Sequence, residues 1–114
     1  MKYMLLFCGT TEAQEEWENA PQEVIAQAME RTGQWFGQNA SRIVASEQLQ
    51  PPRTAEAIRH ENGGTTVTDG PFIEAKEVIG GYAVFDVADE EAALELARSW
   101  PGGGIVEVRP VVAR

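Results

Sequence analysis

The chain has 114 residues, enough for one domain built around a single hydrophobic core. Its composition, 43% hydrophobic and 24% charged, is typical of a globular protein, and no apolar run approaches the roughly 18 to 20 residues of a membrane helix. The net charge of −9, without any basic cluster, argues against nucleic acid as a partner, because that binding depends on Lys and Arg at phosphates. We therefore expect neither a nucleic-acid-binding nor a membrane protein.

The cysteine content and the apolar run near the N-terminus indicate the cellular compartment in which the protein is expected. The apolar run "YMLLFC" is shorter than the roughly 7 to 15 residues of a signal-peptide core. The single cysteine, Cys8, cannot form an intrachain disulfide. Both observations favour a cytoplasmic protein.

The first half of the chain predicts a strand, a helix and a second strand. Residues 2–8 are apolar on both faces, which is typical of a central strand. A polar connection follows, and Asn19-Ala20-Pro21 predicts the start of an amphipathic helix that ends near residues 37–39. Residues 42–49 predict the next strand, which a double proline ends.

The second half begins with a predicted β-hairpin. Residues 57–61 and 65–69 flank "NGG", whose Asn and Gly tolerate the positive φ angles of a tight hairpin turn. Residues 79–87 predict another strand that is apolar on both faces. Asp89 then predicts the cap of a second helix, and residues 105–112 predict the last strand.

This order of elements predicts an α+β fold of one domain, residues 1–114. Two β-α-β units separated by a hairpin correspond to a ferredoxin-like split βαβ fold with an inserted β-hairpin. In that topology two helices cover one face of the sheet and the other face stays bare. Because two central strands are apolar on both sides, we expect a homodimer formed through the sheet face.

Several segments resemble a known family. They are "MKYMLLF", "LQPPRTAEAIR", "VTDGPFIEAKEVIGGYAVFDV", "DEEAALELARSWP" and "VEVRPV". The chain resembles the YCII-related proteins of the dimeric α/β-barrel superfamily, in particular the DGPF-domain branch. The resemblance implies a ferredoxin-like protomer that dimerises face to face, with a cleft near the sheet. Many DGPF proteins resemble products encoded beside alternative sigma factors, which implies a regulatory setting.

The resemblance does not supply a catalytic dyad. Smaller YCII-type relatives carry a His in the first helix and an Asp near the end of the second. Here the first helix, "PQEVIAQAMERTGQWF", has no His, and Ser99 and Trp100 stand where the Asp is sought. The dyad is therefore not transferred to this chain.

The DGPF segment is the main candidate site. Asp69 is the candidate catalytic residue, because a carboxylate presented by a turn can act as a general base. Phe72 is expected to pack as an anchor, and Glu74, Lys76 and Glu77 to line the rim of a ligand site. The alternative is structural, with Asp69 accepting backbone hydrogen bonds in an Asx turn and Lys76 pairing with a glutamate.

The predicted hairpin adds two candidate ligand-binding residues. His60, the single histidine, could shuttle protons if the hairpin folds over a cleft, although a packing or surface role is the alternative. Arg59, with Arg53 and Arg109, could attract an anionic ligand or simply pair with surface acids. We expect no metal site, because no residues have ligand spacing, and no cofactor.

Two hypotheses follow from the sequence. The first is a small homodimer that binds a small molecule in a cleft near the DGPF loop; if it is an enzyme, Asp69 acts with Glu74, Lys76 or Glu77 in acid–base chemistry. The second is a non-catalytic regulatory or protein-interaction module linked to transcription, in which the motif is structural.

Overall fold

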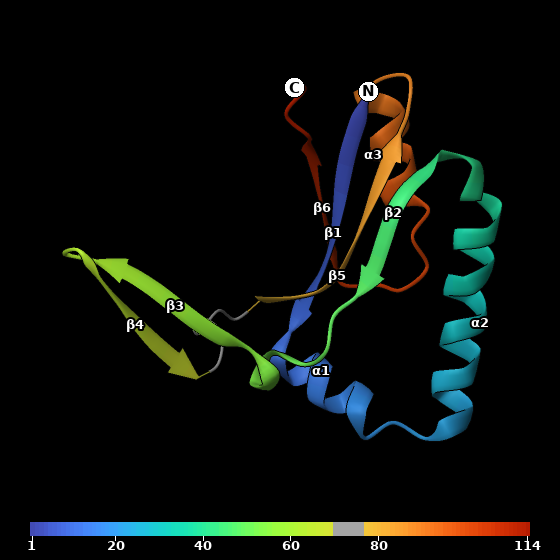
Figure 1. The fold of residues 1–114 in the computed structure, drawn as a ribbon. Helices are drawn as coiled ribbons and strands as arrows, with labels where there is room; N and C mark the ends of the chain where they lie inside the picture. The colour runs from blue at the N-terminus through green and yellow to red at the C-terminus, as the bar shows by residue number, and fades with distance from the viewer. Residues whose placement is uncertain (70–76) are drawn as a thin grey trace.

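The computed structural model describes residues 1–69 and 77–114 of the chain. Within these ranges a four-stranded antiparallel sheet has the order β2-β5-β1-β6, and β3 and β4 form a separate two-stranded sheet (Figure 1). The strands are β1 (Lys2–Thr10), β2 (Ile43–Gln48), β3 (Glu56–Glu61), β4 (Gly64–Asp69), β5 (Glu77–Asp86) and β6 (Ile105–Pro110). The helices are α1 (Thr11–Glu18), α2 (Gln22–Gln38) and α3 (Glu90–Arg98), with short 3-10 turns η1 (Ala40–Arg42) and η2 (Pro52–Thr54).

Two β-α-β units interleave in the main sheet. The chain runs from β1 through α1 and α2 to β2, and from β5 through α3 to β6. The strand order places β5 between β1 and β2, with antiparallel pairing throughout. The predicted α+β, ferredoxin-like arrangement is confirmed, and so is the insertion of a hairpin between the second and third strands of the main sheet.

The helices differ from expectation at two places. The polar connection expected after the first strand is the helix α1, and the Thr10 side chain caps it by accepting a hydrogen bond from the Ala13 N–H at 3.0 Å. Helix α2 begins one residue after Pro21, which is its N-cap and not part of its first turn. None of the helices within residues 1–69 and 77–114 has the length and apolar character needed to cross a bilayer.

The hydrophobic core lies between one face of the main sheet and the helices α2 and α3. Leu5 and Phe85 are fully buried, and they lie on the same face of the neighbouring strands β1 and β5. Trp35, near the end of α2, packs edge-on against Phe85 with 5.5 Å between ring centroids. Among the described residues the buried hydrophobic side chains are Tyr3, Leu5, Trp35, Ala83, Phe85, Val87, Ala93 and Leu96.

The opposite face of the main sheet has an apolar centre and charged edges. Its central cross-strand pairs are Met4–Val84 and Leu6–Tyr82, and all four residues are half-buried. Charged residues surround this centre. Glu47 and Glu107, on the edge strands, are opposite Tyr82 and Leu6, and the pair Lys2–Asp86 lies at one end of the central strands. We call this surface the open face. An apolar centre with a polar rim is the usual anatomy of a protein–protein interface.

The hairpin of β3 and β4 projects away from the rest of the molecule (Figure 1). Its turn has positive φ angles at Asn62 (49°) and Gly63 (78°), as the "NGG" signal predicts. No residue of β3 or β4 is buried. The predicted hairpin is therefore confirmed, and it has no core of its own.

Candidate functional site

The structure describes only the borders of the DGPF segment. Asp69 is the last residue of β4, and Glu77 is the first residue of β5, where its backbone is opposite Thr10. Phe72, Glu74 and Lys76 lie outside the described residues. The candidate site is therefore built from Asp69 and from the elements that meet at the base of the hairpin.

Asp69 has a second carboxylate directly opposite. The hairpin register pairs Asp69 with Glu56, the first residue of β3, and both residues are exposed. Like charges that face each other across two strands destabilise the pair unless a cationic group lies near them. The base of the hairpin is therefore suited to an ammonium or guanidinium group of a ligand.

His60 and Asp69 of the same chain lie too far apart to act together. Both residues lie on the same face of the hairpin, but His60 is opposite Thr65, near the turn, while Asp69 is at the base. Four residues separate the two levels along β3, a distance of about 13 Å at 3.3 Å per residue. A proton shuttle between His60 and Asp69 of the same chain is too long for direct transfer.

The arginines considered as anion-binding groups all have carboxylate partners. Arg59 lies on the other face of the hairpin and pairs with Glu61 at 3.1 Å. The other two pairs are Arg53 with Glu18, at 2.5 Å, and Arg109 with Glu107, at 3.0 Å. These pairs lower the positive potential available to an anionic ligand. The charge at the hairpin therefore favours a cationic or neutral ligand.

The Arg53–Glu18 pair also positions the hairpin base. Glu18 is the last residue of α1, and Arg53 belongs to η2, the turn that leads into β3. The pair links parts of the chain that are 35 residues apart. The exposed pair contributes little to stability by itself. Its position nevertheless brings α1 close to the strand that carries Glu56.

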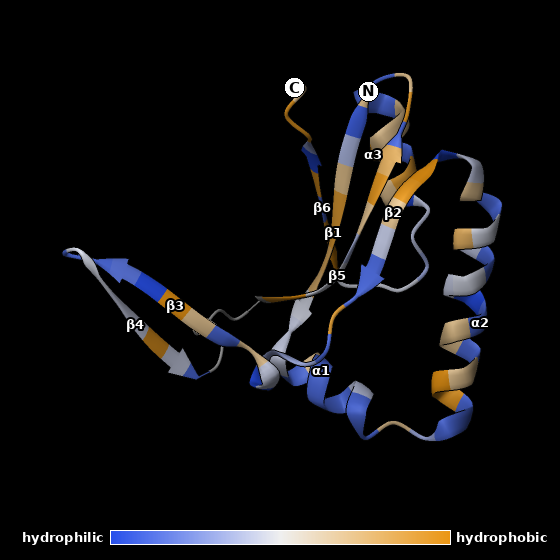
Figure 2. Cartoon of the chain, viewed as in Figure 1, coloured by the Kyte–Doolittle hydropathy of each residue, from blue (hydrophilic) through white to orange (hydrophobic). Residues whose placement is uncertain are grey.

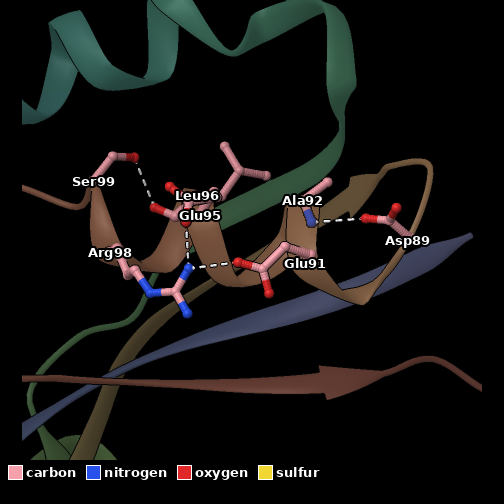
Figure 3. A network of polar contacts seen from close by, with 7 residues as sticks. All are labelled: Asp89, Glu91, Ala92, Glu95, Leu96, Arg98 and Ser99. Carbon is pink, nitrogen blue, oxygen red and sulfur yellow. Dashed lines mark hydrogen bonds and ion pairs between the residues drawn. The ribbon is translucent and has the colours of Figure 1, made fainter.

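A shallow depression of about 390 Å³ lies elsewhere, between α3 and β6. Its lining is mostly apolar, from Leu94, Ala97, Trp100, Val106 and Val108. Arg98 lies at this depression and donates hydrogen bonds to Glu91, at 2.8 Å, and to Glu95 (Figure 3). These bonds raise the pKa of Arg98 above its ordinary value. The depression offers contact area but no group for proton transfer.

Metal ligands do not cluster in the part of the chain that the structure describes. No three His, Cys, Asp or Glu side chains in residues 1–69 and 77–114 are arranged to hold a metal ion. Cys8 is half-buried, and its Sγ donates to the Leu6 carbonyl at 3.5 Å. In this geometry Cys8 is a packing residue of the open face.

The comparison with known protein families covers nearly the whole chain. A family model described as the YCII-related domain matches residues 1–113. The chain belongs to the YCII-related family. The resemblance found from the sequence motifs is thereby confirmed.

A curated relative of this YCII-related chain has no stated activity. An uncharacterized protein of Rhizobium meliloti (strain 1021) is 38% identical over 76 residues. The match covers 63% of this chain, and the chain spans about three fifths, 61%, of that relative's length. Its name therefore adds no ligand or reaction to the family assignment.

In this YCII-related chain a side-chain hydrogen bond joins the ends of α2 and α3. Trp35 in α2 donates its indole N–H to the Ser99 hydroxyl at the end of α3, at 2.8 Å. The Ser99 hydroxyl in turn donates to the Leu96 carbonyl, also at 2.8 Å (Figure 3). Phe7 and Trp100 pack beside this bond, with 4.2 Å between their ring centroids. A structural hydrogen bond and aromatic packing occupy the place where the dyad was sought.

The sequence prediction did not include Glu56, which the hairpin register places opposite Asp69. The sequence did contain the information for this pairing. The two-residue turn at Asn62-Gly63 places Glu61 opposite Gly64, and counting away from the turn along both strands places Glu56 opposite Asp69. The link between Glu18 and Arg53 had no comparable signal. It depends on a helix that the sequence pattern did not predict.

Proposed function

We propose that this YCII-related chain forms a homodimer through the open face and binds a small molecule at the base of the β3–β4 hairpin. Asp69 is the principal contact and Glu56 the second. The observation that carries this proposal is the cross-strand pairing of Asp69 with Glu56. The proposed setting is the cytoplasm, in keeping with a chain that has a single cysteine.

The charges favour a ligand with a basic nitrogen. Two exposed carboxylates face each other at the hairpin base, and the nearby Arg53 and Arg59 already have acidic partners. A protonated amine or guanidine between Asp69 and Glu56 relieves their repulsion and gains charge-assisted hydrogen bonds. If the bound molecule also carries an acidic C–H or O–H, Asp69 is the base that accepts its proton.

A thermal-shift screen of small amines and guanidines tests this site. We expect a ligand-dependent rise in the melting temperature of the wild-type protein that is lost in Asp69→Asn and reduced in Glu56→Gln. Glu61→Gln is the matched control, because Glu61 is an exposed carboxylate of the same hairpin that lies near the turn. Equal shifts in Asp69→Asn and wild type would contradict the site.

The alternative is a non-catalytic regulatory or protein-interaction module linked to transcription. The exposed hairpin favours it, since Ile58 and Val67 on one face are 61% and 60% exposed. Under this alternative Asp69 is a turn residue. The screen then shows no ligand response in wild type, and Asp69→Asn changes only the melting temperature of the free protein.

A further inference from the structure

We propose that the β3–β4 hairpin is an arm that packs across a second copy of this chain and buries the Ile58–Val67 pair there. The inference rests on the homodimer of the proposed function and adds a second, separate contact to it. His60 lies on the same hairpin face as Ile58 and Val67 and then contacts the partner copy.

The face of the hairpin has the pattern of an interface. Ile58 and Val67 are directly opposite each other, and His60 with Thr65 and Glu56 with Asp69 lie on either side of them. Figure 2 shows one strongly hydrophobic (orange) segment in each strand of the hairpin, with less hydrophobic segments on either side. The apolar pair therefore forms a small centre inside a polar rim, as in protein–protein contacts.

The hairpin lacks the support that a two-stranded sheet normally needs. An isolated two-stranded hairpin is marginally stable at best in water, and stability usually comes from a third strand or from packing on a hydrophobic surface. In the described structure β3 and β4 pair only with each other, and none of their residues is buried. We therefore expect the hairpin to be stabilised by packing on the surface of another molecule.

The overall dimensions favour a second copy as that surface. The radius of gyration is 16.1 Å, against about 13 Å for a compact domain of this length. The extents of 46 × 44 × 19 Å describe a flat molecule with a projecting arm (Figure 1). Such a shape exposes more surface than a compact monomer, and a two-fold symmetric dimer covers it with two equivalent arms.

The size of the open face also calls for a further contact. The register of the four strands places about a dozen residues on this face. A standard stable interface takes about 20 to 30 residues from each partner. The open face alone supplies roughly half of that number, and the hairpin face adds to it.

Packing of the arms also changes the role of His60. Within one chain His60 is about 13 Å from Asp69 along the hairpin. In the dimer that we propose, the turn end of the hairpin, with His60, lies on the partner. His60 is then a contact between copies and a neighbour of groups on the partner, and not of its own Asp69.

Sedimentation equilibrium on full-length variants tests the arm. The test variant is Ile58→Thr with Val67→Thr, which keeps strand-forming residues and removes the apolar pair. The matched control is Thr66→Val with Thr68→Val, two exposed positions on the other face of β4. We expect the dimer dissociation constant to rise roughly tenfold or more in the test variant and to stay close to wild type in the control.

Amide hydrogen exchange supplies the second measurement. We expect residues 57–61 and 65–69 of the wild-type protein to exchange more slowly above the dissociation constant than below it. Equal dissociation constants for wild type and the test variant would mean that the Ile58–Val67 face serves another occupant, and would overturn the arm while leaving the dimer. A wild-type protein that stays monomeric would overturn the arm and the proposed dimer together.

Discussion

At the scale of single residues, backbone positions decide how the last strand joins the sheet. Gly103 and Gly104 both have φ angles of +72°, a region that favours glycine. A Cβ on Gly104 would lie 2.5 Å from the Cys8 carbonyl oxygen, whereas a Cβ on Gly103 would meet nothing within 4 Å. Gly104 therefore allows β6 to approach β1, and Gly103 only shapes the turn.

Alanine substitutions separate these two effects. We expect Gly103→Ala to lower the free energy of unfolding by about 1 kcal/mol through backbone strain alone. Gly104→Ala should cost about 3 kcal/mol, because the clash with Cys8 is added to the strain. Urea unfolding of both variants measures the difference, and equal losses would show that the close approach to Cys8 does not matter.

The candidate site was partly predictable at this scale. Asp69 and the hairpin turn are evident in the sequence, and the turn alone implies the pairing with Glu56. The carboxylate partners of Arg53 and Arg109 were not predictable as specific pairs. Arg53 meets Glu18 through tertiary structure, 35 residues away, and exposed Arg side chains have many acids within reach in a chain of net charge −9.

At the scale of elements, the strongly patterned segments were predictable and α1 was not. The strands β1 and β5 have two apolar faces, and α3 has a capping Asp89 before buried Ala93 and Leu96. Helix α1 has no buried residue, so it lacks the apolar stripe that identifies a helix in sequence. Its Thr10 cap and its helix-forming Ala, Gln and Glu residues support it instead.

The two caps should therefore differ in their effect on stability. The Asp89 carboxylate accepts a hydrogen bond from the Ala92 N–H at 2.9 Å and begins a helix that belongs to the core. We expect Asp89→Ala to lower the global free energy of unfolding by about 1 kcal/mol. We expect Thr10→Ala to change it less, and to speed amide exchange within α1, because an eight-residue helix without core contacts opens locally.

Chemical unfolding and hydrogen exchange of both variants check this prediction. A global loss for Thr10→Ala as large as for Asp89→Ala would mean that α1 is part of the cooperative core. Unchanged exchange in residues 11–18 would mean that the Thr10 cap does not hold the helix.

At the scale of the whole molecule, the family and the protomer fold were predictable from the sequence. The sequence motifs pointed to the YCII-related family, and the interleaved β-α-β order follows from the pattern of strands and helices. The position of the hairpin was not predictable in detail, because its strands have little contact with the rest of the molecule to determine a direction. The open face and the arm both lead to the proposed two-fold dimer.

The charge of the molecule predicts how that dimer responds to salt. Two copies that each carry a net charge of −9 repel one another, and salt screens this repulsion. Dimerisation should therefore tighten as the salt concentration rises. A basic protein partner would show the opposite trend, because salt weakens attraction between opposite charges.

The molar mass in solution is the direct test of the proposed dimer. Light scattering at micromolar concentration and about 0.15 M salt should give about 25 kDa, twice the 12.5 kDa of one chain. The fraction of dimer should fall when the salt is lowered. A mass of 12.5 kDa at every salt concentration would contradict the dimer, and with it the proposed use of the open face and the hairpin arm.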